Sequence, residues 1–286
     1  MIHKNNVKLS SMTTFRVGGI AYNVYYPENY DELIELVKSL DKKPYWIIGG
    51  GSNLLINDAH TFDNVICTKN LDSSMIQTDQ MNVFYFGASC RIQHIISFSN
   101  SYGYGGIEEL ISLPATFGGI IYMNAGIGSK NKQIFNISDY VIRVKVLNLS
   151  KMSVQWIDKN DCHFEYRHSV FHNNEYIILG AELKLIEQPI EESKRRIDNR
   201  RKRCKETQEY GKGCFGSCCK EYSRRIQKMV RILPIHKKVS QSSKNANWLL
   251  NNGDASFGDA IRIINISKLL HKLFRKKFEL EIKIWY

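Results

Sequence analysis

Short apolar runs and helical apolar spacings alternate along this chain and predict a mixture of strands and helices. Apolar runs predict strands at residues 24–26, 45–48, 82–86, 140–147, 153–157, 176–185 and 278–285. Apolar residues three or four positions apart predict helices at residues 31–40, 92–100 and 257–274, and a basic helix is expected at residues 190–205. We expect Asn29 or Asp31 to cap the first of these helices. Many short strands with few helices favour an α+β fold over a doubly wound parallel sheet.

The same pattern divides the chain into three segments, which we expect to be domains covering residues 1–66, 67–187 and 188–286. The first segment alternates strand and helix signals. The second carries most of the strands and a glycine-rich stretch at residues 103–128. The third begins with the basic helix after Pro189, a residue suited to a helix start, and continues into a loop of glycines and cysteines at residues 211–220.

Charge is distributed unevenly between the segments. The chain carries a net charge of +12, yet residues 1–190 hold 16 basic and 18 acidic residues, whereas residues 191–286 hold 24 basic and 10 acidic residues. This asymmetry favours a separate module that faces an anion. A solvated basic face that keeps the protein soluble is the alternative.

Three consecutive glycines, Gly49, Gly50 and Gly51, follow the predicted strand at residues 45–48. Backbone without side chains approaches a ligand closely, and phosphate is a common guest because backbone N–H groups can point at it. The spacing of these glycines matches neither the dinucleotide-binding fingerprint nor the P-loop. A plain tight turn is therefore the alternative for this motif alone.

The glycine-rich stretch at residues 103–128 favours a ligand-binding role for the glycines over plain tight turns. Its only charged residues before position 129 are Glu108 and Glu109, which disfavours a fully solvated loop. Two side-chain-poor loops in neighbouring segments fit a flat, phosphorylated cofactor held between them. Two ordinary surface loops remain the alternative.

Seven motifs occur in order over nearly the whole chain, and together they resemble the UDP-N-acetylenolpyruvoylglucosamine reductase (MurB) family. The motifs are TFRVGG at 14–19, GGGSNLL at 49–55, PATFGG at 114–119 with NAG at 124–126, YRHSVF at 166–171, GS at 216–217, NNGDAS at 251–256 and ELEI at 279–282. The resemblance implies two α+β subdomains that form an FAD-binding fold of the vanillyl-alcohol-oxidase and p-cresol-methylhydroxylase (PCMH) type. It also implies a smaller α+β substrate-binding domain, which matches the three segments.

The resemblance implies an FAD-dependent reduction of UDP-N-acetylenolpyruvoylglucosamine to UDP-N-acetylmuramate in peptidoglycan precursor synthesis. NADPH reduces the FAD in the first half-reaction, and the sugar nucleotide then receives hydride at C3 and a proton at C2. The cofactor supplies the hydride chemistry, while the protein supplies position and charge. A UDP-sugar also offers the basic third of the chain an anionic partner.

The resemblance further implies roles for individual residues. Arg167 would hold the substrate carboxylate, because a guanidinium stays charged and binds a carboxylate at two points. Ser217 would donate the proton to C2, and Glu281 would pair with Arg167 or help to organise the enol. The residues implied to bind substrate are Lys220, Tyr166 and Asn247. Those implied to bind FAD are Gly49, Gly50, Gly51, Ser52, Asn53, Pro114, Ala115, Thr116, Gly118, Gly119, Asn124, Ala125 and Gly126, with Thr14 and Arg16 as further supports.

The third segment departs from the family pattern and keeps two alternatives open. Residues 218–222 read CCKEY where the family has an aromatic-Lys-Asn-Pro run, and Asn245 stands where the family has histidine. A related flavoprotein reductase with a different anionic substrate is one alternative. The other is a basic nucleic-acid-binding module, although its interleaved aromatic residues and its helix-turn-helix or zinc-finger spacing are missing.

The cysteine and histidine spacings predict no metal site. Cys214, Cys218 and Cys219 lack the second ligand pair that zinc prefers. The three histidines His163, His168 and His172, on an alternating strand-turn, are not expected to share one face. Seven cysteines, an odd number, suit free thiols in a reducing compartment. With neither an apolar signal-peptide core nor a run of ~18 apolar residues, we expect a cytoplasmic monomer without a nucleic-acid or membrane partner.

Overall fold

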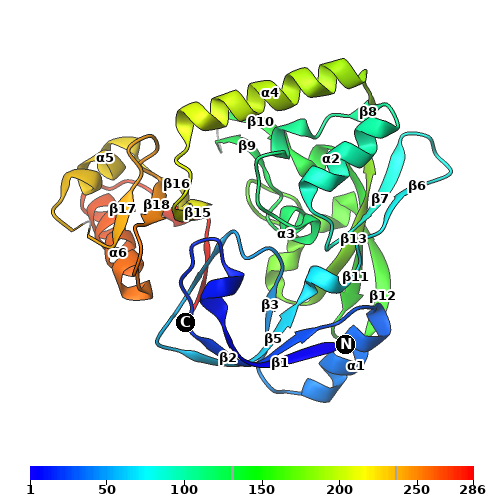
Figure 1. The fold of residues 1–286 in the computed structure, drawn as a ribbon, viewed down its shortest axis with the longest axis horizontal. Coiled ribbons are helices and arrows are strands. Elements are labelled where there is room, and N and C mark those ends of the chain that lie inside the picture. Colours follow the sequence, from blue (N-terminus) through cyan, green and yellow to red (C-terminus); the bar gives the residue numbers. More distant parts are fainter. Residues whose placement is uncertain (130–131, 236) are drawn as a thin grey trace. The chain divides into compact units, whose positions relative to one another are not determined.

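The computed structural model describes residues 1–129, 132–235 and 237–286 of the chain. These residues form two compact units (Figure 1). The first unit comprises Met1–Lys4, Val24–Gly50 and Asn64–Arg203, and the second comprises Asn5–Asn23, Gly51–Asp63 and Cys204–Tyr286. Strands β1 (Ile2–Lys8), β2 (Ile20–Tyr26) and β5 (Thr61–Cys67) contribute residues to both units and form a sheet with β3 (Trp46–Ile48) in the order β1-β2-β5-β3.

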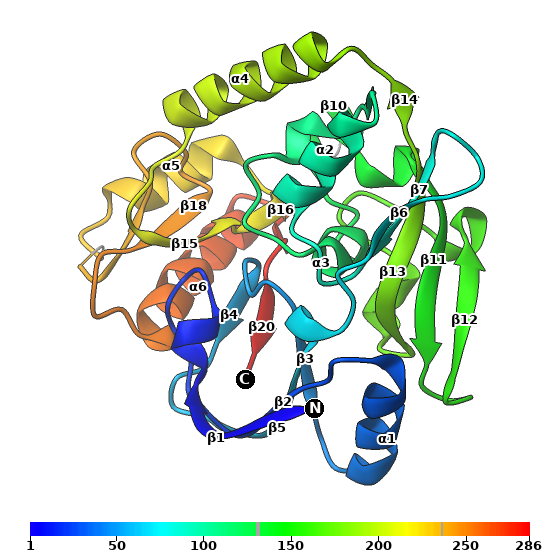
Figure 2. The same cartoon turned by 45° about the vertical axis from the view of Figure 1, so that its right-hand side comes forward.

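A five-stranded sheet with helices on both faces organises the first unit. Its order is β12-β11-β13-β7-β6, and its strands are β6 (Met75–Gln77), β7 (Val83–Gly87), β11 (Val141–Asn148), β12 (Ser153–Asp158) and β13 (Tyr176–Lys184). Helices α2 (Ile92–Ser101) and α3 (Phe117–Tyr122) share one buried cluster with Val144 and Ala181 (Figure 2). Helix α1 (Tyr30–Leu40) packs on Leu147 and Leu179, which point to the opposite face because strand side chains alternate.

The predicted elements of the first unit are largely confirmed. The Asn29 side chain accepts a hydrogen bond from Glu32 N at 2.9 Å and caps α1. The glycine-rich stretch is not a continuous loop, because it contains β8 (Tyr104–Gly105), a 3-10 helix at Glu108–Leu110, helix α3 and the start of β9 (Gly126–Ser129). Strand β9 pairs with β10 (Lys132–Asn136), and β8 pairs with β14 (Ile186–Glu187).

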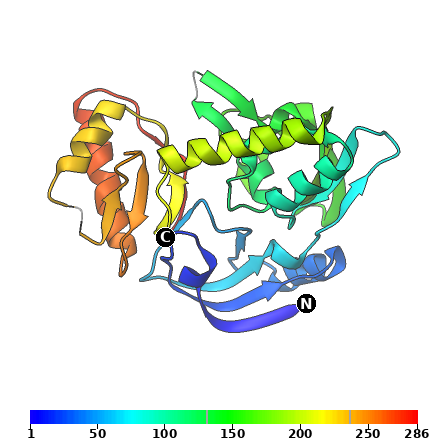
Figure 3. The same ribbon diagram turned by 45° about the horizontal axis from the view of Figure 1, so that its top comes forward.

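The second unit joins two helices to small antiparallel sheets. Its strands are β4 (Leu54–Ile56), β15 (Gly213–Ser217), β16 (Cys219–Glu221), β17 (Val239–Gln241), β18 (Trp248–Asn251), β19 (Glu279–Leu280) and β20 (Lys283–Trp285). Helices α5 (Arg224–Ile232) and α6 (Phe257–Leu273) lie on one side of β17 and β18 (Figure 3). Ile226, Ile263 and Leu249 belong to the same buried cluster. Ser256 and Asp259 form a reciprocal capping box at the start of α6.

Two expectations for the second unit were wrong, and one helix was not predicted. Residues 211–220, expected as a loop, contain β15 and the first residues of β16, which pair with β18 and β19. The strand expected at residues 278–285 is divided into β19 and β20 by Glu281 and Ile282. Helix α5 was not predicted, although Ile226 and Val230 have helical spacing. Within the described residues, no helix has both the length and the apolar character needed to cross a bilayer.

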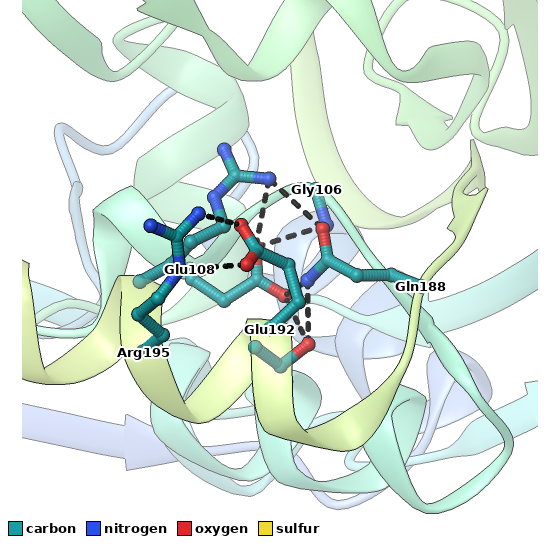
Figure 4. Close-up of polar contacts among 7 residues, drawn as sticks. Gly106, Glu108, Gln188, Glu192 and Arg195 are labelled. Atoms are coloured by element: carbon teal, nitrogen blue, oxygen red, sulfur yellow. Dashed lines mark hydrogen bonds and ion pairs between the residues drawn. The ribbon is translucent and has the colours of Figure 1, made fainter.

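A fully buried carboxylate, Glu108, ties the glycine-rich stretch to the start of α4 (Ile190–Thr207) in the first unit (Figure 4). One Glu108 oxygen accepts hydrogen bonds from Gln188 Nε2 at 2.9 Å and Ser193 Oγ at 3.0 Å. The other accepts from Gly106 N at 2.9 Å and lies 3.6 Å from Arg196 Nη1. Because burial is costly for an unpaired charge, these four donors make the position tolerable. The low charge of residues 103–128 therefore reflects burial.

Replacing Glu108 with alanine should lower the free energy of unfolding by about 2–3 kcal/mol, because buried donors lose their shared acceptor. Glu192, drawn beside it in Figure 4, is the matched control, since its pair with Arg195 is exposed. Glu192→Gln should leave stability unchanged. Denaturant titration of both variants measures the difference, and equal midpoints for Glu108→Ala and the parent protein would contradict the structural role.

Candidate active site

The glycine motif begins in the first unit, where Gly49 and Gly50 follow β3. Gly50 N donates a hydrogen bond to Thr116 Oγ1 at 3.2 Å. A Cβ at Gly49 would lie 2.7 Å from Thr116 Oγ1, and one at Gly50 would lie 3.1 Å from Thr116 N. Only glycine permits this approach of residues 49–50 to residues 114–116, which the sequence implied to lie beside one cofactor.

Gly119 contributes open space in the same region. A Cβ at Gly119 would have only Thr116 Oγ1 within 4 Å, at 3.8 Å, whereas Gly118 is packed against Ala88 and donates a hydrogen bond to Ala88 O. Gly118 thus anchors α3 to the strand end, while Gly119 leaves room. The predicted cofactor residues Pro114 and Ala115 lie against Gly50.

The remainder of the glycine motif belongs to the second unit. Gly51 has φ +67°, a left-handed conformation that favours glycine, and a Cβ there would collide with Met12 O. Gly51 O accepts a hydrogen bond from Thr14 N at 3.1 Å. The Thr14 Oγ1 atom is inaccessible to water and has no hydrogen-bond partner among the described residues. Ser52 and Asn53 continue the motif into β4.

Arg167 sits at the corner of a tight turn in the first unit. Glu165 and His168 exchange backbone hydrogen bonds of 3.1 and 3.2 Å across this turn, and Arg167 has φ +55°. The turn directs the buried guanidinium onto the backbone carbonyls of Asn124, at 3.2 Å from Nη1, and Gly126. The guanidinium carbon also lies 4.8 Å from the centre of the Tyr166 ring.

Asn124 holds this turn in place instead of presenting its amide to solvent. Its Nδ2 donates to Glu165 O at 2.9 Å, and its Oδ1 accepts from Ser138 N at 3.2 Å. Ala125 is bonded through its backbone to Ile120 and Ile137, and a Cβ at Gly126 would collide with β10. The backbone of the Asn-Ala-Gly motif is therefore packed closely against residues 135–138, and this packing supports the two carbonyls that bind Arg167.

Ser217 ends β15 in the second unit at an irregular position. The strand pairs with β18 at Cys214 and again at Ser217, and the residues between them bulge out of register. Gly216 has φ +80°, and a Cβ there would meet nothing within 4 Å. The Ser217 hydroxyl makes no hydrogen bond to any described residue and is partly exposed. The bulge thus presents this hydroxyl beside open space.

The residues after Ser217 are held by Asn247 and Glu281. Asn247 O accepts from Cys218 N at 2.8 Å, while its side chain accepts from Cys219 N at 2.9 Å and donates to Cys219 O at 2.8 Å. Glu281 N donates to Cys218 O at 2.8 Å. Ser217 and Glu281, predicted from separate motifs, are therefore joined through one intervening residue.

Two lysines face this region of the second unit. Lys220 Nζ lies 2.6 Å from Glu279 Oε1, and the lysine side chain is 19% exposed. Burial, reinforced by the charge of Lys220, lowers the pKa of Lys283 from its ordinary value. Lys283 was not among the predicted site residues, because a lysine in a short terminal strand gives no distinguishing sequence signal.

The cysteines near Ser217 are free thiols, with Cys218 and Cys219 buried and Cys214 half-buried. Burial raises the pKa of Cys214 to about 11, and hydrogen bonding with Cys218 together with burial raises the pKa of Cys219 far above its usual range. His168 and His172 do contact each other, with ring nitrogens 3.0 Å apart, so the expectation that they occupy different faces was wrong. No group of three metal-binding side chains occurs within residues 1–129, 132–235 and 237–286.

The predicted site residues form three groups. The first unit brings together Gly49, Gly50 and Thr116, and separately Tyr166, Arg167, Asn124 and Gly126. The second unit brings together Asn53, Ser217, Lys220, Asn247 and Glu281. The supporting hydrogen bonds of Asn53 and Asn247 were not predicted, since they depend on partners more than 25 residues away in sequence.

Comparison with known proteins places these features in one family. Residues 21–157 match the family model of the FAD binding domain. The crystal structure of UDP-N-acetylenolpyruvylglucosamine reductase (MurB) from Thermus caldophilus has a TM-score of 0.80, 24% sequence identity and full coverage of both chains. This likeness confirms the predicted α+β class with an FAD-binding PCMH-type fold.

Sequence relatives extend the comparison over the whole chain. The UDP-N-acetylenolpyruvoylglucosamine reductase of Caldanaerobacter subterraneus is 28% identical and covers 97% of this chain and 90% of its own. That of Prochlorococcus marinus subsp. pastoris is 30% identical over 96% of this chain and 93% of its own. The resemblance inferred from the seven motifs is thus confirmed, and the chain belongs to the UDP-N-acetylenolpyruvoylglucosamine reductase family.

Proposed function

We propose that this chain is a flavoprotein oxidoreductase that reduces UDP-N-acetylenolpyruvoylglucosamine to UDP-N-acetylmuramate, a step of peptidoglycan precursor synthesis. FAD is its cofactor and NADPH its co-substrate. The observation that carries the proposal is the extent of the family relationship, since 30% identity runs over 96% of the chain. The relationship therefore includes the segment with Ser217 and Glu281 as well as the FAD binding domain.

The glycine motifs fit an FAD cofactor. Open space beside Gly119 and the unpartnered buried oxygen of Thr14 are features that a phosphorylated, polar ligand would use. We propose that the FAD is held by residues 49–53, 114–119 and 124–126. When bound, FAD supplies hydride chemistry that no amino-acid side chain provides.

Arg167 is proposed to bind the carboxylate of the substrate and to stabilise the negative charge that develops there. The guanidinium is buried, and its two backbone contacts fix its plane before substrate arrives. Tyr166 stacks against it and is proposed to contact the substrate as well. A preorganised, desolvated cation stabilises developing charge better than a mobile surface side chain does.

Ser217 is proposed to donate the proton to C2. Its hydroxyl is partly exposed at the end of a bulged strand, and the next residue, Cys218, accepts a hydrogen bond from Glu281 N through its carbonyl. A serine is a weak acid, so the negative charge on the substrate must drive the transfer. Glu281 is proposed to pair with Arg167 or to organise the enol.

Lys220 is proposed to bind the phosphates of the sugar nucleotide. Lys220→Met should raise the KM for the sugar nucleotide by about 10-fold with little change in kcat, because a charge that contacts a remote phosphate binds ground state and transition state alike. Lys277→Met, which removes an 81% exposed lysine of the same region, is the control and should leave KM unchanged. A fall in kcat without a change in KM for Lys220→Met would contradict the assignment.

The three sequence segments are proposed as functional regions: residues 1–66 and 67–187 for FAD and residues 188–286 for substrate. The grouping of Ser217, Lys220, Asn247 and Glu281 in the last region supports its assignment. Ion pairs neutralise part of the positive charge of residues 188–286, namely Arg195–Glu192, Arg201–Asp198, Lys220–Glu279 and Lys277–Glu221.

We also propose a cytoplasmic monomer without a nucleic-acid or membrane partner.

The departure of residues 218–222 from the family pattern favours one second candidate, a reductase of the same family with a different anionic substrate. The deciding experiment is an assay of NADPH oxidation by the purified, FAD-loaded protein with and without UDP-N-acetylenolpyruvoylglucosamine. Oxidation that depends on the sugar nucleotide supports the proposed function. FAD binding without such turnover would favour the second candidate.

A further inference from the structure

We propose that Asn53 and Asn247 are positioning residues for the proposed proton transfer, because they clamp Ser217 and Glu281 together from opposite sides. The inference rests on the proposed function for its kinetic consequence, but its structural part does not. The two asparagines, which the motifs implied to touch FAD and substrate, use their amides on the protein's own backbone.

Asn247 clamps the turn that follows Ser217. It is buried, with 4% exposure, and makes three hydrogen bonds of 2.8–2.9 Å to Cys218 and Cys219. Its side-chain amide pairs with both backbone groups of Cys219, so it acts as an extra strand residue at this point. These bonds fix the residues that follow Ser217, and the pairing of Ser217 with Trp248 of β18 fixes Ser217 itself.

Asn53 clamps the segment that carries Glu281. Its Nδ2 donates to Glu281 O at 3.1 Å, and its backbone carbonyl accepts from Lys283 N at 3.0 Å. Strands β4 and β20 then continue this contact as a parallel pair from Leu54 and Lys283 onward. The side chain of Asn53 is therefore directed at Glu281, although its neighbours belong to the glycine motif.

The two clamps meet at one hydrogen bond, between Glu281 N and Cys218 O at 2.8 Å. The backbone of Glu281 is thus held on both sides, by Cys218 through its N–H and by Asn53 through its carbonyl. The resulting chain, Asn53–Glu281–Cys218–Asn247, gives Ser217 and Glu281 a fixed relative position. A displacement of about 1 Å in such a pair can cost 100-fold in rate.

A buried amide network supports this chain from behind. Gln241 Nε2 donates to Ala246 O at 2.6 Å and to Gln227 Oε1 at 2.7 Å, and Gln227 in turn bonds Ser267 Oγ at 2.9 Å. All three side chains are buried. They hold the segment that precedes Asn247 against α5 and α6, which resists its displacement.

The test combines hydrogen exchange with separate half-reactions in Asn247→Ala. Without the amide, exchange at the Cys219 and Glu281 N–H groups should accelerate by about 10-fold. Reduction of the sugar nucleotide should slow by at least about 10-fold, whereas reduction of the bound flavin by NADPH should match the parent protein. Asn247→Asp keeps the acceptor for Cys219 N and loses the donor to Cys219 O, so it tests the effect on Glu281 exchange and on the half-reactions with less change in shape.

Asn64→Ala is the matched control, because Asn64 is equally buried and its amide also bonds a backbone carbonyl, Pro44 O at 3.2 Å. It should lower stability without changing Glu281 exchange or either half-reaction. Asn53→Asp removes the donor to Glu281 O, so it should accelerate exchange at Glu281 and slow the same half-reaction as Asn247→Ala. Unchanged Glu281 exchange in Asn53→Asp would overturn the role of Asn53.

Unchanged exchange at Glu281 in Asn247→Ala and Asn247→Asp would overturn the clamp itself. Accelerated exchange with both half-reactions unaltered would overturn its role in proton transfer. If the parent protein does not reduce the sugar nucleotide at all, the proposed function fails, and this result is distinct because the exchange data still decide whether the chain of hydrogen bonds holds Glu281.

Discussion

Reduction of the sugar nucleotide should slow by about 10²–10⁴-fold in Ser217→Ala, the range that general acids contribute. The hydroxyl has no hydrogen bond to a described residue and lies beside the open space at Gly216, so its loss leaves no buried group unpaired. The fold and the FAD site should therefore remain intact. Rapid mixing of the NADPH-reduced protein with the sugar nucleotide measures this step alone, and mixing of the oxidised protein with NADPH measures the other.

Ser240→Ala provides the control for this serine. Ser240 lies in β17 of the same unit and bonds Asn252 Oδ1 at 3.2 Å, away from the Ser217 turn. Both half-reactions should be unchanged in it. If Ser217→Ala slows the two half-reactions by the same factor, the serine has a structural role and a different proton donor is required.

Arg167→Lys should lower kcat/KM for the sugar nucleotide by about 10²–10³-fold, the cost of removing a preorganised donor at a developing negative charge. Lysine keeps the positive charge but offers a single point of contact instead of a planar fork. It also cannot reach both carbonyls, those of Asn124 and Gly126, that orient the guanidinium. Steady-state kinetics with varied sugar nucleotide measure the effect.

The matched arginine control is Arg143→Lys. Arg143 makes a two-point contact with Glu182, with both hydrogen bonds at 2.8 Å, on the five-stranded sheet of the same unit. Its side chain is 41% exposed, so stability and kinetics should change little. Equal kinetic effects in Arg143→Lys and Arg167→Lys would show that Arg167 has no special relation to the substrate.

The sequence predicted the first unit well because its elements are long and locally encoded. Apolar runs gave β7, β11, β12 and β13 within a few residues, and the Asn29 cap marked the start of α1. Helix α3 was missed, since a six-residue helix containing Gly118 and Gly119 depends on burial of Phe117 and Ile120, which only the surrounding sheet provides.

The second unit was harder to predict because distant pairing decides its structure. Strand β15 contains two glycines and a β-bulge, and it exists because β18 lies beside it. Helix α5 has four basic residues among nine, so its mean hydropathy is lower than that of α6, although its apolar and basic residues lie on clearly separate faces. Short strands whose pairing partners lie far away in the sequence cannot be predicted well from the local pattern of residues.

In the candidate site, too, some residues could be predicted from the sequence and others could not. Reactive types such as Arg167, Ser217 and Glu281 stand out in motifs. Their supports do not, because the carbonyls behind Arg167 and the amide of Asn247 act through backbone geometry. Glu108 illustrates the limit: the scarcity of charge in residues 103–128 disfavoured a solvated loop, but it did not predict that Gln188 and Ser193 are the partners of Glu108.

The central claim is that this chain transfers reducing equivalents from NADPH to an enolpyruvyl sugar nucleotide through bound FAD. The most direct measurement is the visible flavin spectrum of the FAD-loaded protein, first bleached anaerobically with NADPH and then mixed with UDP-N-acetylenolpyruvoylglucosamine. Our account predicts that the oxidised spectrum returns and that UDP-N-acetylmuramate forms in equal amount. A flavin that stays bleached in the presence of the sugar nucleotide would contradict it.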